Sequence, residues 1–182
     1  MDTYEAFFRA YYDNQKDYLL NFYKGPLVMT PENYYDLVLQ KTTIKEQDFD
    51  AIEKKIKLTI PKSFKQFFVT AYSYERPFQL PTLTLAAAWH HDPFEALNDF
   101  LFENALSKHI LELQLIPIGI YQDNFYVCLD LRQPVSETDA PVTYFDFDAA
   151  MLNEEPIVEE PVFPSFKMFI EHLTNCIQTR TY

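Results

Sequence analysis

The sequence predicts an α+β fold in which helices come first, an antiparallel sheet follows and one helix closes the chain. Three observations predict it. Apolar residues recur at helical spacing before residue 72, alternate with polar ones in two segments between residues 125 and 148, and return to helical spacing after Ser165. The length of 182 residues and the hydrophobic content of 48% suit a single domain.

The N-terminal 40 residues predict two helices. Aromatic residues from Tyr4 to Tyr23 fall near i, i+3, i+4, i+7 spacing, and Gly25-Pro26 ends this first helix. Thr30-Pro31-Glu32 opens a second helix that runs to about Gln40, because proline suits the first helical position. The aromatic stripe could pack on the chain's own core or against a second copy in a homodimer.

Residues 44–72 predict two further helices in a compact arrangement. The first runs from Ile44 to Lys57, with Thr43 as a candidate N-cap. The second begins at Pro61, and its periodicity makes Phe64 and Phe67 core residues.

A segment of uncertain type and another helix come next. Prolines break residues 77–89, which could form a strand or a loop. The run Asp92-Pro93-Phe94-Glu95 is a helix start, with an N-cap acceptor, proline at N1 and glutamate at N3. This helix is expected to reach about Ser107.

Three strands and a final helix complete the chain. The strands are expected at Leu113–Ile120, Phe125–Leu131 and Val142–Asp148, with a hairpin turn at residues 122–124 between the first two. An acidic, proline-containing loop over residues 149–164 leads to the last helix, which Ser165 caps. Its expected inward residues are Phe166, Phe169, Ile170, Leu173 and Ile177.

The net charge of −12 is concentrated late in the chain. Residues 1–119 carry 16 acidic and 12 basic side chains, whereas residues 120–182 carry 11 and 3. Such a surface repels nucleic-acid phosphates and attracts a basic partner, although acidic solubility alone also explains it. Between Arg132 and Lys167 no Lys or Arg occurs, and the carboxylates there are Glu137, Asp139, Asp146, Asp148, Glu154, Glu155, Glu159 and Glu160.

Composition excludes several function classes. With only two glycines, the chain has no Gly-rich phosphate loop, dinucleotide fingerprint or nucleophile elbow, so no cofactor is expected. It lacks an apolar run of about 18 residues and an export signal, which predicts a cytoplasmic protein without membrane contact. Cys128 and Cys176 lie far apart, which favours two reduced thiols but leaves a disulfide open.

No catalytic or metal constellation is evident. His90 and His91 lie beside Asp92, but adjacent residues of an extended segment point to opposite sides and chelate poorly. Cys128 lies among apolar residues, as expected of an inert thiol. The sequence therefore predicts a non-enzymatic protein. The weaker alternative is an enzyme, such as a hydrolase, that uses a cluster of Asp130, Asp146 and Asp148.

One candidate binding surface remains. If the last two strands lie together, one face would carry aromatic rings beside carboxylates, which suits contact with arginine-rich proteins. Helices could cover that face instead, which would make Tyr126 and Tyr144 core residues. The candidate partner-binding residues on the sheet and the acidic loop are Tyr126, Asp130, Tyr144, Asp146, Asp148, Glu154, Glu155, Glu159 and Glu160.

Six short motifs occur in a fixed order: Ile52-Glu53, Ile60–Phe67, Leu115–Gly119, Tyr126–Asp130, Pro141–Phe145 and Ser165–Ile170. In this order they resemble the SUKH superfamily, which includes yeast cell-wall-synthesis regulators and many bacterial immunity proteins. The resemblance implies a SUKH-like core over residues 44–174, with residues 1–40 as a helical extension packed on it.

The same resemblance implies a non-catalytic protein that binds and neutralises a cognate toxin. The acidity adds the expectation of a basic, nuclease-type toxin. The alternative is a regulatory or scaffold module that binds signalling or cell-wall-synthesis proteins.

Overall fold

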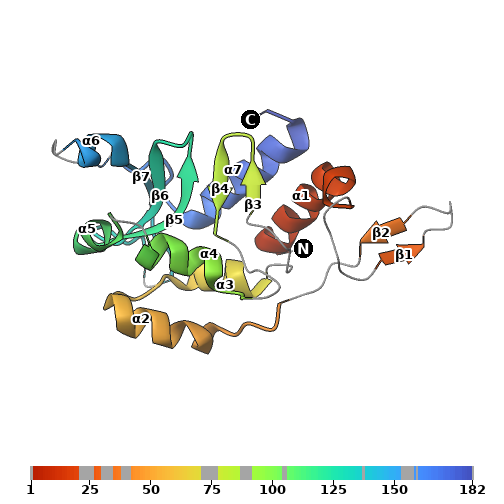
Figure 1. Ribbon diagram of the computed structural model, residues 1–182. Coiled ribbons are helices and arrows are strands. Elements are labelled where there is room, and N and C mark those ends of the chain that lie inside the picture. Colours follow the sequence, from red (N-terminus) through yellow and green to blue (C-terminus); the bar gives the residue numbers. More distant parts are fainter. Residues whose placement is uncertain are drawn as a thin grey trace.

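The computed structural model describes residues 2–20, 27–29, 35–37, 42–70, 78–86, 92–103, 106–136, 138–152, 158 and 160–181, with backbone only for residues 15–20, 27–29, 35–37, 150 and 151. Its centre is a five-stranded antiparallel sheet of order β3-β4-β5-β6-β7, which confirms the α+β class (Figure 1). The strands are β3 (Phe78–Leu80), β4 (Leu83–Leu85), β5 (Leu115–Tyr121), β6 (Phe125–Asp130) and β7 (Val142–Asp146).

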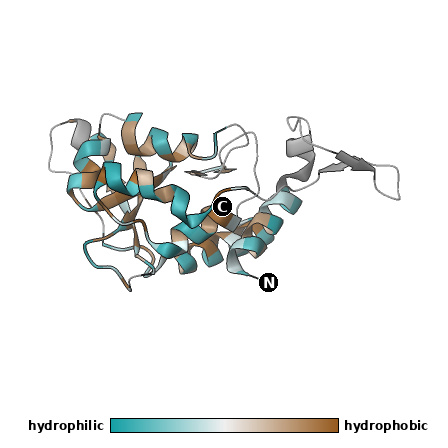
Figure 2. Cartoon of the chain, turned by 90° about the horizontal axis from the view of Figure 1, so that it is seen from below, coloured by the Kyte–Doolittle hydropathy of each residue, from teal (hydrophilic) through white to brown (hydrophobic). Residues whose placement is uncertain are grey.

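Helices surround the sheet. Those before it in sequence are α1 (Thr3–Leu20), the 3₁₀ helix η1 (Glu46–Phe49), α2 (Asp50–Ile56) and α3 (Lys62–Thr70). The later ones are α4 (Glu95–Asn98), the π-helix η2 (Asp99–Glu103), α5 (Ser107–Glu112), α6 (Phe147–Met151) and α7 (Phe166–Thr179). In Figure 2 they carry both hydrophilic and hydrophobic residues, as expected of helices that cover a sheet.

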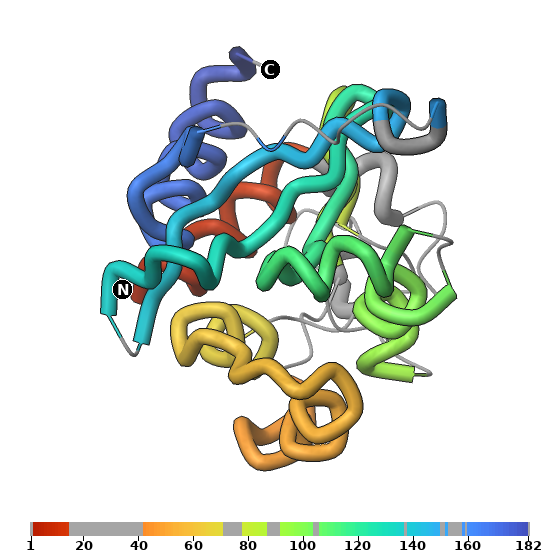
Figure 3. The backbone as a smooth tube through the Cα atoms, turned by 90° about the vertical axis from the view of Figure 1, so that its left-hand side faces the viewer, coloured from red at the N-terminus to blue at the C-terminus, as the bar shows by residue number. Residues whose placement is uncertain are grey.

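Both faces of the sheet are covered. On one face, Val127, Leu129 and Val142 share a buried cluster with residues of α1, α3 and α7. On the other, Tyr126, Cys128 and Phe145 pack in a second cluster with residues of η2 and α5. The first and last helices, α1 and α7, lie side by side, so the two ends of the chain close the same layer (Figures 1 and 3).

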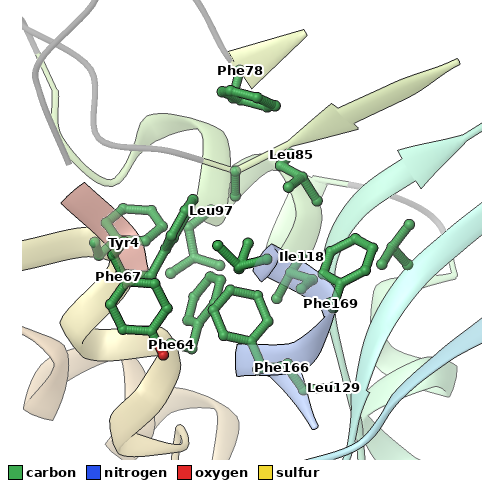
Figure 4. Close-up of a cluster of buried hydrophobic side chains, with 14 of the residues drawn as sticks. Tyr4, Phe64, Phe67, Phe78, Leu85, Leu97, Ile118, Leu129, Phe166 and Phe169 are labelled. Carbon is green, nitrogen blue, oxygen red and sulfur yellow. The ribbon is translucent and has the colours of Figure 1, made fainter. Parts of the chain in front are cut away.

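The first cluster is largely aromatic. Phe166 of α7 meets Phe64 and Phe67 of α3 edge to face, with ring centroids 5.4 and 5.5 Å apart (Figure 4). Aromatic pairs in this geometry contribute about 0.5–1.5 kcal/mol beyond the area they bury. The predicted stripe of α1 also joins this cluster through Tyr4, Phe7, Phe8 and Tyr11.

A capping residue explains where α7 begins. The Oγ of Ser165 accepts a hydrogen bond from the Met168 N–H at 3.1 Å, as predicted for α7. All five residues expected inside that helix are buried. The Oδ1 of Asp92 accepts from the Phe94 N–H at 3.0 Å, but this bond lies in a turn before the helix. Because α4 begins at Glu95 with Phe94 as its N-cap and no side-chain cap, the predicted cap at Asp92 is wrong.

Four other predicted details are wrong. Tyr35–Leu37 forms strand β2, paired with β1 (Leu27–Met29), where a helix was expected, because strand-favouring residues on both segments satisfy their backbone groups across the pair. Thr43 does not cap the third helix, since η1 begins after Lys45, whose N–H donates to Asp48. The single helix expected after Asp92 is divided into α4, η2 and α5, and α6 occupies the start of the expected acidic loop.

Gly119 marks a close approach between strands. A Cβ at this position would lie 2.4 Å from the Thr84 carbonyl oxygen and 2.7 Å from Leu85 Cδ2. Both distances are shorter than packed atoms tolerate, so β4 can pair with β5 here only because residue 119 has no side chain.

Candidate protein-binding surface

The candidate residues on the last two strands do not share one face. Residues directly opposite each other in a sheet point to the same side. Tyr126 is opposite Phe145, and Val127 is opposite Tyr144. Tyr126 and Asp130 therefore lie on the face covered by α5 and η2, whereas Tyr144 and Asp146 lie on the other. The prediction of a common face is wrong, because the register places even-numbered residues of β6 opposite odd-numbered residues of β7.

Tyr126 and Asp130 are core residues. Their exposed fractions are 3% and 2%, so neither reaches solvent. The ring of Tyr126 packs against Phe100 of η2 and Phe147 of α6, at centroid distances of 6.4 and 5.3 Å. For Tyr126, the alternative in which helices cover the face is the one the structure shows.

Arg132 neutralises the carboxylate of Asp130. Its Nε donates to Oδ1 at 2.9 Å and its Nη2 to Oδ2 at 2.7 Å, a bidentate pair. The Arg132 backbone N–H donates to the same Oδ1 at 2.9 Å. Hydrogen bonding to Asp130 raises the pKa of the guanidinium further above its usual value. Asp130 therefore contributes no free negative charge to the surface.

Asp139 is also engaged within the fold. Its Oδ1 accepts hydrogen bonds from the Ser63 hydroxyl at 2.8 Å, the Ala140 N–H at 2.9 Å and the Phe166 N–H at 3.1 Å. One carboxylate thus joins the start of α3 to the start of α7. Burial of Tyr4 is the main cause that raises the pKa of its hydroxyl, and the charge of Asp139 raises this pKa further. From the sequence alone, Asp139 is only one of the carboxylates between Arg132 and Lys167.

Three other carboxylates gather at one end of the sheet. Asp123 is exposed in the β5–β6 turn, where it and Gln122 have positive φ values of 62° and 50°. The Phe147 N–H donates to the Asn124 carbonyl at 3.2 Å, which holds the end of β7 beside this turn. Asp146 is half-buried and accepts from the Ala149 N–H at 3.1 Å, while Asp148 is exposed.

We call Asp123, Asp146 and Asp148 the acidic sheet end. The segments that form it contain no Lys or Arg, since neither residue type occurs in 109–131 or 133–166. Asp146 and Asp148 are predicted partner-binding residues, whereas the sequence indicates only a turn role for Asp123. Of the predicted loop glutamates, Glu160 is exposed. Glu154, Glu155 and Glu159 lie outside the described residues.

Tyr144 belongs to a half-buried aromatic groove of about 360 Å³ between β4, β5, β7 and α7. Its ring stacks on Tyr121 at a centroid distance of 5.1 Å and an interplanar angle of 6°. His172 and Cys176 of α7 also line the groove, and the Cys176 Sγ lies 3.4 Å from the His172 Nε2. Their spacing of four residues on a helix was readable from the sequence.

The two thiols are free and differ in access, so they should differ in reactivity. Burial raises the pKa of Cys128, which is 0% exposed, whereas Cys176 is half-buried. We expect maleimide to modify Cys176 of the folded protein at least about 100-fold faster than Cys128, because the thiolate is the nucleophile. Peptide mass spectrometry after timed labelling measures both rates. Similar rates would contradict this, and Cys176→Ser should abolish the fast phase.

The structure brings together no metal or carboxylate centre among the residues it describes. In those ranges, no three His, Cys, Asp or Glu side chains are placed to hold a metal ion. Asp130 lies at the opposite end of β6 from Asp146, so the carboxylates of the enzyme alternative are not assembled. His90 and His91 lie outside the described residues. No helix within the described part of the chain is long and apolar enough to cross a membrane.

Residues of the recognised motifs hold the fold together. The Glu53 Oε1 accepts from the Ile60 N–H at 2.6 Å and pairs with the Lys65 Nζ at 2.8 Å, so it fixes the link between α2 and α3. Gly119 allows β4 to approach β5, and Asp130 is paired with Arg132. These motif residues thus have architectural roles.

A family model described as the SMI1 / KNR4 family (SUKH-1) matches residues 43–172, which is 130 of the 182 residues. The matched range begins just before η1 and ends within α7, so it contains the whole five-stranded sheet. A search of curated proteins and a search of solved structures each found no match.

Proposed function

Because the chain belongs to the SMI1 / KNR4 family (SUKH-1), we propose that it is an immunity protein that neutralises a cognate bacterial toxin by binding it. The family supports a general immunity or regulatory role through protein binding, and its members are generally non-catalytic. The toxin proposed is a basic, nuclease-type protein. Since such a toxin acts on nucleic acid, the proposal places this chain in the cytoplasm.

The acidic sheet end is the observation that carries this proposal. Asp123 and Asp148 are exposed there, and no cation of the segments that form it neutralises them. A nuclease cleft is basic because it binds phosphates, so these carboxylates would occupy the place of nucleic acid. Glu154, Glu155, Glu159 and Glu160 follow α6 in sequence and would extend the same charge.

Two finer points belong to the same proposal. We treat residues 1–182 as one domain, since α1 buries Tyr4, Phe7 and Phe8 in the cluster that α3 and α7 share. A homodimer through the aromatic N-terminal helix remains a prediction. Its described stripe residues pack inside the chain, and the side chains of Tyr18 and Phe22 lie outside the described part.

Rescue from killing tests the function. Co-expression with the toxin gene product encoded beside this chain should restore growth, and the two purified proteins should bind. The variant Asp123→Lys/Asp148→Lys should weaken binding at least tenfold, because it reverses two charges that face the basic partner. Binding is measured by calorimetry at about physiological salt, and again at higher salt, where screening should weaken it.

A matched control separates local from global charge. Glu46→Lys/Asp50→Lys makes the same change in net charge at two exposed carboxylates, at the starts of η1 and α2. Figure 1 shows α2 at the bottom of the molecule and α6 at the top. This control should keep affinity within about twofold. Equal loss in both variants, or no rescue by this chain, would contradict the proposal. Recovery of signalling or cell-wall-synthesis proteins without a toxin would assign the regulatory role instead.

A further inference from the structure

A second groove, of about 630 Å³, lies between the C-terminal end of α2, η2 and α5. Figure 1 shows α5 above α2 in this part of the molecule. The groove has the size of a small-ligand or peptide site, for which about 300–1,000 Å³ is typical. Its lining includes Leu58 and Leu111, which are half-buried, so part of the wall is apolar.

The groove is cationic, in contrast to the chain as a whole. Lys55, Lys57 and Lys108 line it together with one carboxylate, Glu112. The Lys108 Nζ lies 3.8 Å from the Glu112 Oε1, and both side chains are largely exposed, so this pair is weak. Two further lysines therefore give the groove a net positive charge, although the chain carries −12.

Local geometry fixes the ammonium of Lys55 and the backbone of Lys57 at the groove. The Lys55 Nζ lies 3.3 Å from the centroid of the Phe102 ring, a cation–π contact that keeps the ammonium on the groove wall. Lys57 ends α2 in the left-handed conformation, with φ 59°, and its N–H donates to the Glu53 carbonyl at 2.7 Å. The charge is therefore placed by the fold and is not only a consequence of composition.

The groove and the acidic sheet end lie at opposite ends of β5. Gln114 lines the groove just before the strand begins, and Asp123 follows just after Tyr121 ends it. A strand of seven residues spans about 23 Å, at about 3.3 Å per residue. The net positive charge of the groove favours an acidic ligand, opposite in sign to the partner proposed for the acidic sheet end.

We propose that this groove binds an acidic segment of a partner protein, with apolar side chains against Leu58 and Leu111 and carboxylates on the three lysines. Charge complementarity selects the sign of the segment, and the apolar wall selects a peptide that alternates acidic and apolar residues. In an extended peptide, alternate side chains point to opposite sides, so one side faces the wall while the other meets the ammonium groups.

Fluorescence anisotropy of the full chain with a labelled peptide of alternating Glu and Leu tests this surface. We expect saturable binding that weakens with salt, and little binding of the matching peptide of alternating Lys and Leu. Lys55→Glu/Lys108→Glu should weaken the Glu peptide at least tenfold. Lys108→Glu alone should weaken binding of the Glu peptide severalfold. This variant should still fold, because the Lys108 side chain is 89% exposed.

The control Lys62→Glu/Lys167→Glu changes two exposed lysines outside the groove and should leave affinity within about twofold. Absence of saturable binding, equal binding of both peptides, or equal loss in the control would overturn the proposal. So would salt-dependent self-association abolished by Lys55→Glu/Lys108→Glu in sedimentation, since it would assign the groove to a second copy. None of these outcomes depends on a toxin, so they test the groove separately from the proposed function.

Discussion

Replacing Arg132 with methionine is expected to lower the free energy of unfolding by about 3 kcal/mol. Asp130 is 2% exposed, and Arg132 holds both of its carboxylate oxygens. Removing the guanidinium leaves a buried charge that, within the described part of the chain, only the backbone N–H of residue 132 still meets. The loss lies at the low end of the range for broken buried pairs because the arginine side chain keeps 39% of its surface exposed.

Urea denaturation at neutral pH measures this loss, provided that the slope against denaturant stays unchanged. Lys108→Met is the matched control, since it removes a cation from an exposed pair and should cost less than about 0.5 kcal/mol. Asp130→Asn/Arg132→Met should recover part of the loss, because the charge that lacked a partner is gone. A loss for Arg132→Met no larger than for the control would contradict the buried pair.

Local features of this fold were readable from the sequence. Side-chain chemistry within a few residues decides where α7 begins at Ser165, and one apolar stripe decides which of its sides is buried. The turn at residues 122–124 is equally local. The six motifs also indicated the order of the elements, because their residues make contacts that hold the fold. The family model matches the same part of the chain.

The composition of the binding surface could not be predicted in the same way. Alternation shows which residues of one strand share a face, but not which residues of the next strand they meet. The pairing of Tyr126 with Phe145 depends on the path of residues 131–141, and an offset of one residue would have placed Tyr144 beside it. The alternation within Phe125–Asp130 and within Val142–Asp146 was therefore right, while the combination of the two faces was wrong and Asp148 lies in α6.

The lysine groove shows the same limit at longer range. Lys55 and Lys57 are separated from Lys108 by about 50 residues, and no local signal connects them. They line one groove because the C-terminal end of α2, η2 and α5 all border it in the fold. By contrast, the His172–Cys176 pair needed only helical spacing.

Asp139 provides the second large effect, and alanine at this position should lower the free energy of unfolding by about 3 kcal/mol. Its carboxylate accepts three hydrogen bonds, from Ser63, Ala140 and Phe166. Hydrogen bonds to a charged group contribute about 1.5–3 kcal/mol each, and water replaces part of that at this half-buried position. Ser63→Ala alone should lower the free energy of unfolding by less than Asp139→Ala does. In the Asp139→Ala background, the loss caused by Ser63→Ala should be about 1 kcal/mol smaller than in the wild type, because its hydrogen-bond partner is already absent.

Asp148→Ala is the control that separates an effect on stability from an effect on partner binding. Asp148 is exposed, so its loss should change the free energy of unfolding by less than about 0.5 kcal/mol. If the acidic sheet end binds the partner, Asp148→Ala should weaken binding with stability unchanged, whereas Asp139→Ala should reduce stability with the affinity of the folded fraction unchanged. Equal unfolding free energies for the two variants would mean that Asp139 does not join α3 to α7. The expected difference between the two variants would instead separate carboxylates close in sequence into those that hold the fold and those that meet the proposed partner.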